Sequence, residues 1–158
     1  MASADTAAGA AQPARHVLAV YAHPWAHSFT GFILHSAVRG ARAAGHSVEI
    51  ADLYAEGFDP VLRHADYAQF DHKPMPEDVR REQARVERSD ALMFAFPVWW
   101  WSFPAMRTQI DIGVMSYAGL TDVRSQFFYE IDDDPESHEE HLRLAYELGR
   151  TFLAPEPA

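Results

Sequence analysis

The residues best suited to chemistry in this sequence are three consecutive tryptophans, Trp99, Trp100 and Trp101, which follow Pro97 and Val98. Neither a strand nor a helix can bury three consecutive large side chains on one face. At least one indole is therefore exposed or lines a site, and a flat aromatic ligand would explain such an aromatic wall. Packing would explain a single tryptophan, but three in a row favour ligand binding or a subunit interface.

A second loop, residues 23–30, carries groups suited to binding phosphate. It follows a predicted strand and opens a predicted helix, whose N-terminus presents unpaired N–H groups and the positive end of a dipole. Ser28 and Thr30 add hydroxyl groups, and His23 and His27 add rings that can donate a hydrogen bond. The glycine-rich fingerprints of dinucleotide sites and P-loops are missing. As alternatives, Ser28 would be a plain helix N-cap, and a hydrogen bond of His23 would only anchor the loop.

The elements that position these loops alternate between strand and helix. Apolar runs with β-branched residues predict strands, while Ser28 and Gly45 are typical of the start and the end of a helix. The alternation predicts an α/β fold with a doubly wound parallel sheet. We predict strands at 16–22, 47–53, 91–96 and 123–131, and helices at 29–44, 77–88, from Pro104 to the turn at 117–120, and 136–148, with a long irregular segment at 55–76.

The run from Ala91 to Phe96 predicts a central strand, because it is apolar without alternation and so reads as buried on both faces. Pro97 ends the strand, since it has no N–H group to give to the ladder. Open α/β sheets bind ligands outside the carboxyl ends of their strands. The loop with the tryptophans and the loop at residues 23–30 are therefore expected at the same edge of the sheet.

Acidic residues are absent from both of these regions. The chain has a net charge of −10 and 23 acids, yet none lies between Thr6 and Val48 or between Ala91 and Ile110. An Ala-rich start and buried strands naturally lack charge, which is one explanation. The other is that two loops on the same edge are kept free of carboxylates because an anion sits between them.

Length and composition limit the class of protein. The 158 residues are enough for one domain, expected at 15–150, with a disordered tail at 1–14 and a C-terminal tail at 151–158. The absence of cysteine excludes disulfides and thiolate catalysis, and the negative charge argues against nucleic-acid binding. No apolar run spans a membrane and no signal peptide is apparent, so we expect a cytoplasmic protein. The histidines lack metal-ligand spacing, so we expect no metal site.

At these two loops the sequence resembles the flavodoxin-like NAD(P)H:quinone oxidoreductases. The similarity extends from about His16 to Gly149. Ala22-His23-Pro24 with Ser28-Phe29 looks like the phosphate loop of that family, and Phe96 to Ala105 looks like its flavin loop. Asp52-Leu53-Tyr54 matches the end of its second strand, and Ile112 to Phe128 looks like its last helix and strand.

The resemblance implies a flavodoxin-like fold that binds FAD, or alternatively FMN, at the carboxyl edge of the sheet. In that family NAD(P)H delivers hydride to the flavin, which passes it to a quinone-like acceptor, usually within a homodimer. By resemblance, the phosphate and ribityl side is bound by His23, Ser28, Phe29 and Thr30, and the ring system by the loop with Pro97, Val98, Trp99, Trp100 and Trp101. No catalytic residue is assigned.

The chain departs from the family between Met106 and Arg107. The family continues there with another strand and a Gly-Gly loop, whereas this chain runs directly into the last helix and strand. We therefore expect four strands, with one family strand missing and residues 123–131 placed beside 91–96 or left at a gap. Two functions follow: a flavin-dependent oxidoreductase, or a shortened, non-catalytic binding or dimerisation module.

Overall fold

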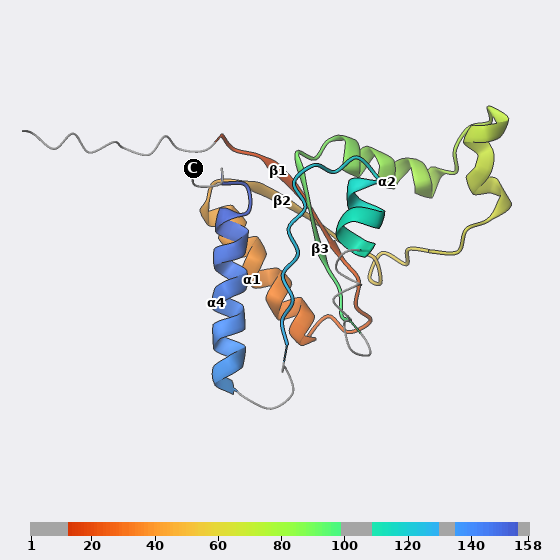
Figure 1. The fold of residues 1–158 in the computed structure, drawn as a ribbon. Coiled ribbons are helices and arrows are strands. Elements are labelled where there is room, and N and C mark those ends of the chain that lie inside the picture. Colours follow the sequence, from red (N-terminus) through yellow and green to blue (C-terminus); the bar gives the residue numbers. More distant parts are fainter. Residues whose placement is uncertain (1–12, 99–108, 130–134, 155–158) are drawn as a thin grey trace, which may run out of the picture.

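The computed structural model describes residues 13–98, 109–129 and 135–154. The predicted strands and helices up to residue 98 end within one residue of their predicted bounds. In chain order the elements are β1 (His16–Tyr21), α1 (Phe29–Ala43), β2 (Ser47–Asp52), the 3₁₀-helix η1 (His64–Asp71), α2 (Glu77–Glu87), β3 (Ala91–Ala95), the π-helix η2 (Gln109–Ser116) and α4 (Pro135–Thr151), as Figure 1 shows.

The sheet is parallel, with strand order β2-β1-β3 in the described residues, which confirms the doubly wound, flavodoxin-like α/β arrangement. Val17 of β1 pairs with Val48 on one side and with Ala91 on the other. The core forms where β1 meets α1, and its largest fully buried side chains are Val17, Leu18, Leu34 and Val38.

The prediction that β3 is central and buried on both faces is wrong for the described residues. The centre of the sheet is β1, and β3 lies at its edge, with Phe94 41% exposed. An apolar run without alternation shows that both faces of a strand suit burial, but it does not say which strands lie on its two sides.

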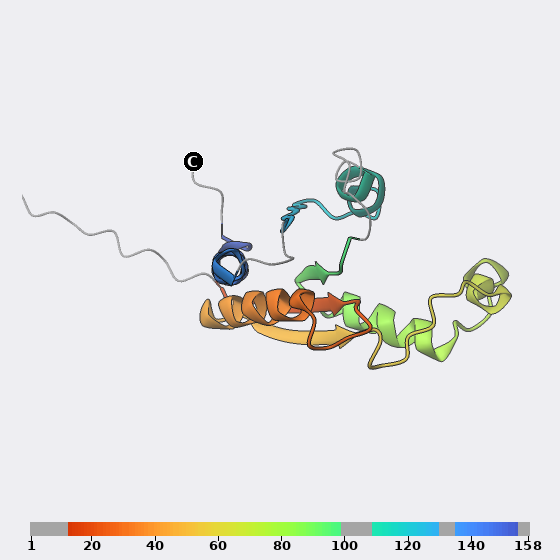
Figure 2. The same cartoon turned by 90° about the horizontal axis from the view of Figure 1, so that it is seen from below.

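The predicted fourth strand is also absent from the part of the chain that is described. Residues 123–129 pair with no strand there, and Figure 2 shows this segment lying apart from β3 with no described element between them. The rings of Phe127 and Tyr129 stack on each other, with centroids 6.0 Å apart. A strand-like sequence forms a strand only where a neighbouring edge offers backbone partners, and here the segment is left at a gap.

Helix α1 packs against the sheet, and α4 packs beside α1 (Figures 1 and 2). Their backbones approach so closely that a Cβ on Gly40 would lie 1.9 Å from the carbonyl oxygen of Tyr146, and one on Gly149 would lie 1.9 Å from that of Ala37. The hydroxyl of Ser36 donates to the carbonyl of Leu142 at 2.7 Å. Small residues thus fix α4 on α1, and α4 runs to Thr151, three residues beyond its predicted end at 148.

The segment that was predicted to be irregular contains a helix. Within residues 55–76, η1 begins after Arg63, whose backbone N–H donates to the carboxylate of Asp66 at 2.6 Å. Figure 1 shows this segment extending away from the sheet.

Ion pairs hold α2 against β2 and the turn that follows it. Arg85 lies 3.1 Å from Glu49 and 2.5 Å from Glu56, and Arg88 lies 2.6 Å from Glu49. Burial alone would raise the pKa of Glu49, but the hydrogen bonds and charge of Arg88, with the charge of Arg85, lower it below its ordinary value. The hydrogen bond from Arg85 likewise lowers the pKa of Glu56.

Candidate functional site

The loop between β1 and α1 ends in the helix cap that the sequence predicts. Ser28 is the N-cap of α1, and its Oγ accepts a hydrogen bond from the N–H of Gly31 at 3.1 Å. The first turn of α1 contains no acidic residue. The N–H groups of Phe29 and Thr30 have no partner within a helix, because residues at these positions lack a preceding turn. They are the groups in this loop best suited to an anion.

A buried tyrosine that the sequence analysis missed supports this loop. Tyr21, at the end of β1, is only 3% exposed. Its hydroxyl lies 2.9 Å from Oγ of Ser28 and 3.2 Å from the carbonyl oxygen of Trp25. The only sequence signal is a tyrosine that ends an otherwise aliphatic strand, and such a residue reads equally well as ordinary core.

Gly31 allows the loop to lie directly on the first turn of α1. A Cβ at this position would be 2.5 Å from the carbonyl oxygen of Ala26 and 3.0 Å from the hydroxyl of Tyr21. Gly31 is not part of a glycine-rich fingerprint, which the sequence lacks. Its role is to allow the close approach of the loop backbone.

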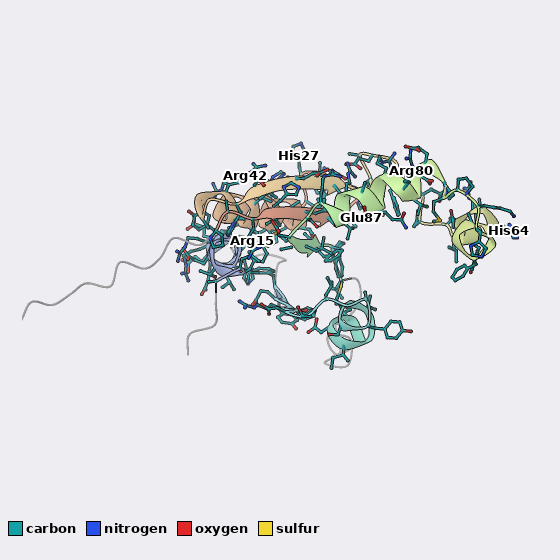
Figure 3. The ribbon with its side chains drawn as sticks, turned by 90° about the horizontal axis from the view of Figure 1, so that it is seen from above. Arg15, His27, Arg42, His64, Arg80 and Glu87 are labelled. Carbon is teal, nitrogen blue, oxygen red and sulfur yellow. The ribbon has the colours of Figure 1, made fainter. Side chains whose placement is uncertain are left out.

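The two histidines of the loop have different surroundings. Nδ1 of His23 accepts a hydrogen bond from the N–H of Trp25 at 3.0 Å, which is the loop-anchoring contact considered as the alternative. The ring of His23 also stacks on Tyr21, with centroids 6.3 Å apart. His27 is exposed at the surface of the loop (Figure 3), so its ring is accessible to a ligand.

The end of β3 lies beside this loop. The N–H of Ala22 donates to the carbonyl oxygen of Ala95 at 3.1 Å, which ties the chain leaving β1 to the end of β3. Beyond it, Phe96 is 43% exposed, Pro97 is half-buried and Val98 is 38% exposed. Trp99, Trp100 and Trp101 lie outside the described residues. At this edge, then, apolar side chains are exposed next to the start of the loop that leads into α1.

The ring of Phe29 is directed toward α4. It lies 4.6 Å from the ring of His138 and 6.2 Å from that of His141, between centroids. The ring of Phe128 meets that of His141 edge-on, with centroids 5.5 Å apart. Phe29 therefore contributes its ring to helix packing, which leaves its backbone N–H as the group that can meet a ligand.

Other features of the described residues lie elsewhere. One shallow hollow is formed by α1 and α4, and another runs along α2 beside β2. Asp52, at the end of β2, accepts hydrogen bonds from the N–H groups of Tyr54 and Ala55, so it serves its own turn. In the described part of the chain, no three His, Asp or Glu side chains are grouped as metal ligands, and no helix is long and apolar enough to cross a membrane.

This parallel sheet, with a helix N-terminus at its carboxyl edge, defines a flavodoxin-like protein. The family model described as the flavodoxin-like fold matches residues 15–109, and the chain therefore belongs to this family.

Its relatives carry oxidoreductase names. The ribosyldihydronicotinamide dehydrogenase (quinone) of Rattus norvegicus is 30% identical over 109 residues, which are 58% of this chain and 47% of that protein. An uncharacterized NAD(P)H oxidoreductase of Escherichia coli is 34% identical over 90 residues, which are 55% of this chain and 45% of that protein. This chain thus spans about half the length of the curated relatives that it matches.

A solved structure shares the fold over nearly the whole chain. The NAD(P)H:quinone oxidoreductase from Methanothermobacter marburgensis superposes with a TM-score of 0.80, covering 92% of this chain and 100% of that one. At 22% identity, the likeness supports the fold alone.

Proposed function

We propose that this chain is a flavin-dependent NAD(P)H oxidoreductase that passes hydride from NAD(P)H through FAD, or alternatively FMN, to a quinone-like acceptor. One observation carries the proposal: the hydrogen bond from Ala22 to Ala95 brings the loop before α1 next to the end of β3. This loop leads into the acid-free N-terminus of α1, and exposed apolar side chains follow the end of β3. Such a pair of surfaces suits a ligand that is anionic at one end and flat at the other.

The described residues fit a flavin phosphate. Gly31 lets the loop lie against the first turn of α1, and the N–H groups of Phe29 and Thr30 can donate there. In this proposal the phosphate and ribityl chain lie against the loop that contains His23, Ser28, Phe29 and Thr30, and the ring system lies against the loop with Pro97, Val98, Trp99, Trp100 and Trp101.

The flavin would supply the hydride chemistry, and the protein would supply position, electrostatics and exclusion of water. The absence of acidic residues from the first turn of α1 avoids repulsion of a phosphate. The apolar side chains of Phe96 and Val98 would cover part of the ring system. As in the resemblance, we propose a homodimer in the cytoplasm, without nucleic-acid or membrane partners.

Flavin binding is the direct test. The purified protein is incubated with FAD and, separately, with FMN, freed of excess ligand, and scanned for flavin absorption. We expect bound flavin that NADH or NADPH reduces and that a quinone then reoxidises, the quinone being reduced to the hydroquinone. A preparation that remains colourless with both flavins would remove the proposal.

The alternative is a shortened, non-catalytic binding or dimerisation module. It is favoured by the half-exposed apolar edge at β3, and by a match that covers only 47% of the relative from Rattus norvegicus. Quinone reduction by NADH is the measurement that separates the two functions. A rate well above that of the same concentration of free flavin would exclude the module.

A further inference from the structure

The hydroxyl of Tyr21 is a polar group inside the apolar core. Its ring belongs to the core cluster with Ala19, Leu34 and Val38. A phenylalanine would fill the same space without a buried hydroxyl, which costs free energy unless it is hydrogen-bonded. Both partners of this hydroxyl, the Trp25 carbonyl and Oγ of Ser28, belong to the loop before α1.

The donors and acceptors around Ser28 are determined by counting protons. The carbonyl of Trp25 can only accept, so Tyr21 donates its single proton there, and Ser28 donates its proton to the oxygen of Tyr21. Oγ of Ser28 also accepts from the N–H of Gly31. Since Ser28 is 5% exposed, its hydroxyl proton is used within the loop rather than directed at a ligand.

We propose that Tyr21 is a positioning residue, whose hydroxyl holds the loop before α1 in the shape that presents the N–H groups of Phe29 and Thr30 to a phosphate. Ser28 acts through this contact and through its helix cap, not by donating to the ligand. The identity of the ligand rests on the proposed function, whereas the contact between Tyr21 and Ser28 does not.

The test compares a flavin with and without phosphate. Wild type, Tyr21→Phe, Ser28→Ala and the double variant are titrated with FMN and with riboflavin. We expect Tyr21→Phe to weaken FMN binding about tenfold, the size of one or two lost hydrogen bonds, and to leave riboflavin binding unchanged. In the Ser28→Ala background the same substitution should have a smaller effect, because the contact between the two hydroxyls is already gone and only the bond to the Trp25 carbonyl is left to lose. Tyr54→Phe, at an exposed tyrosine, is the matched control.

Two results would overturn the proposal. Equal losses for FMN and riboflavin would show that Tyr21 supports only the fold. An equal loss of FMN affinity with and without Ser28 would show that the two hydroxyls act independently. If wild type binds neither of these compounds nor FAD, the proposed function fails, and amide hydrogen exchange at residues 25–31 of the free protein decides instead. Faster exchange in Tyr21→Phe than in wild type is expected, and unchanged exchange would remove the positioning role.

Discussion

At the scale of the residue, the site depends on what is missing as much as on what is present. Gly31 has no side chain where Ala26 and Tyr21 approach it, and α1 has no carboxylate in its first turn. Ser28 is buried, and its hydroxyl is already bonded. The side chains therefore shape the loop, and the backbone provides the donors suited to an anion.

Gly31→Ala tests this arrangement. The new methyl group would meet the carbonyl oxygen of Ala26, so the loop has to move away from α1. We expect a loss of about 1–3 kcal/mol in the free energy of unfolding, as for other overpacked positions, and a loss of FMN affinity. Urea unfolding and FMN titration measure the two effects.

The matched control for this change is Gly45→Ala. Gly45 has a φ of 91° and open space around it, so alanine costs only backbone strain, about 1–2 kcal/mol. FMN affinity should remain that of wild type. Equal FMN affinity in the two variants would contradict the close approach at Gly31.

At the scale of the element, two contacts fix the helices on the sheet. Glycine and alanine let α4 lie on α1, and ion pairs tie α2 to β2. The first contact depends on backbone proximity, and the second on ionised carboxylates. They should therefore respond to different perturbations, one to added volume and the other to pH.

Gly149→Ala should disrupt the contact between α4 and α1. Its Cβ would overlap the carbonyl oxygen of Ala37, which belongs to helix backbone and cannot rotate away. We expect a loss of at least about 2 kcal/mol in the free energy of unfolding, measured in urea. Glu140→Ala on the same helix, at an exposed residue, should change it by less than about 0.5 kcal/mol. A Gly149→Ala variant as stable as wild type would show that α4 is not held this closely.

Acid should weaken the attachment of α2. The pKa values of Glu49 and Glu56 are lowered in the folded protein. Both carboxylates therefore stabilise the fold fully at pH values above their ordinary pKa of 4.5, and this stabilisation is lost as the pH falls through the lowered pKa values. Arg85→Met removes mainly the part of that dependence due to Glu56, because the pKa of Glu49 is lowered chiefly by Arg88. The stability of the variant should therefore fall less steeply than that of wild type below about pH 5.

Urea unfolding at a series of pH values checks this difference. Arg80→Met, which removes an exposed pair with Glu77, is the control and should retain the wild-type slope. The interpretation fails if Arg85→Met and wild type lose stability in parallel.

At the scale of the whole molecule, the sequence predicted local elements better than their neighbours. The ends of β1, α1 and β2 follow from apolar runs, a serine cap and a glycine stop, which act within a few residues. The edge position of β3 and the unpaired segment 123–129 depend on which strands are adjacent, and no local pattern encodes that. Tyr21 was missed for the same reason, because its hydroxyl matters only once the loop folds back onto it.

The edge position of β3 can be tested by comparing two large apolar side chains. Leu18 is fully buried in the central strand, so Leu18→Ala should cost about 2–5 kcal/mol in the free energy of unfolding. Phe94 is a larger residue, but it is half-exposed on β3, so Phe94→Ala should cost only about 1–2 kcal/mol. Urea unfolding at two protein concentrations measures both losses. A cost for Phe94→Ala that equals or exceeds that for Leu18→Ala would mean that β3 is covered in solution, and a cost that grows with protein concentration would mean that a second copy covers it.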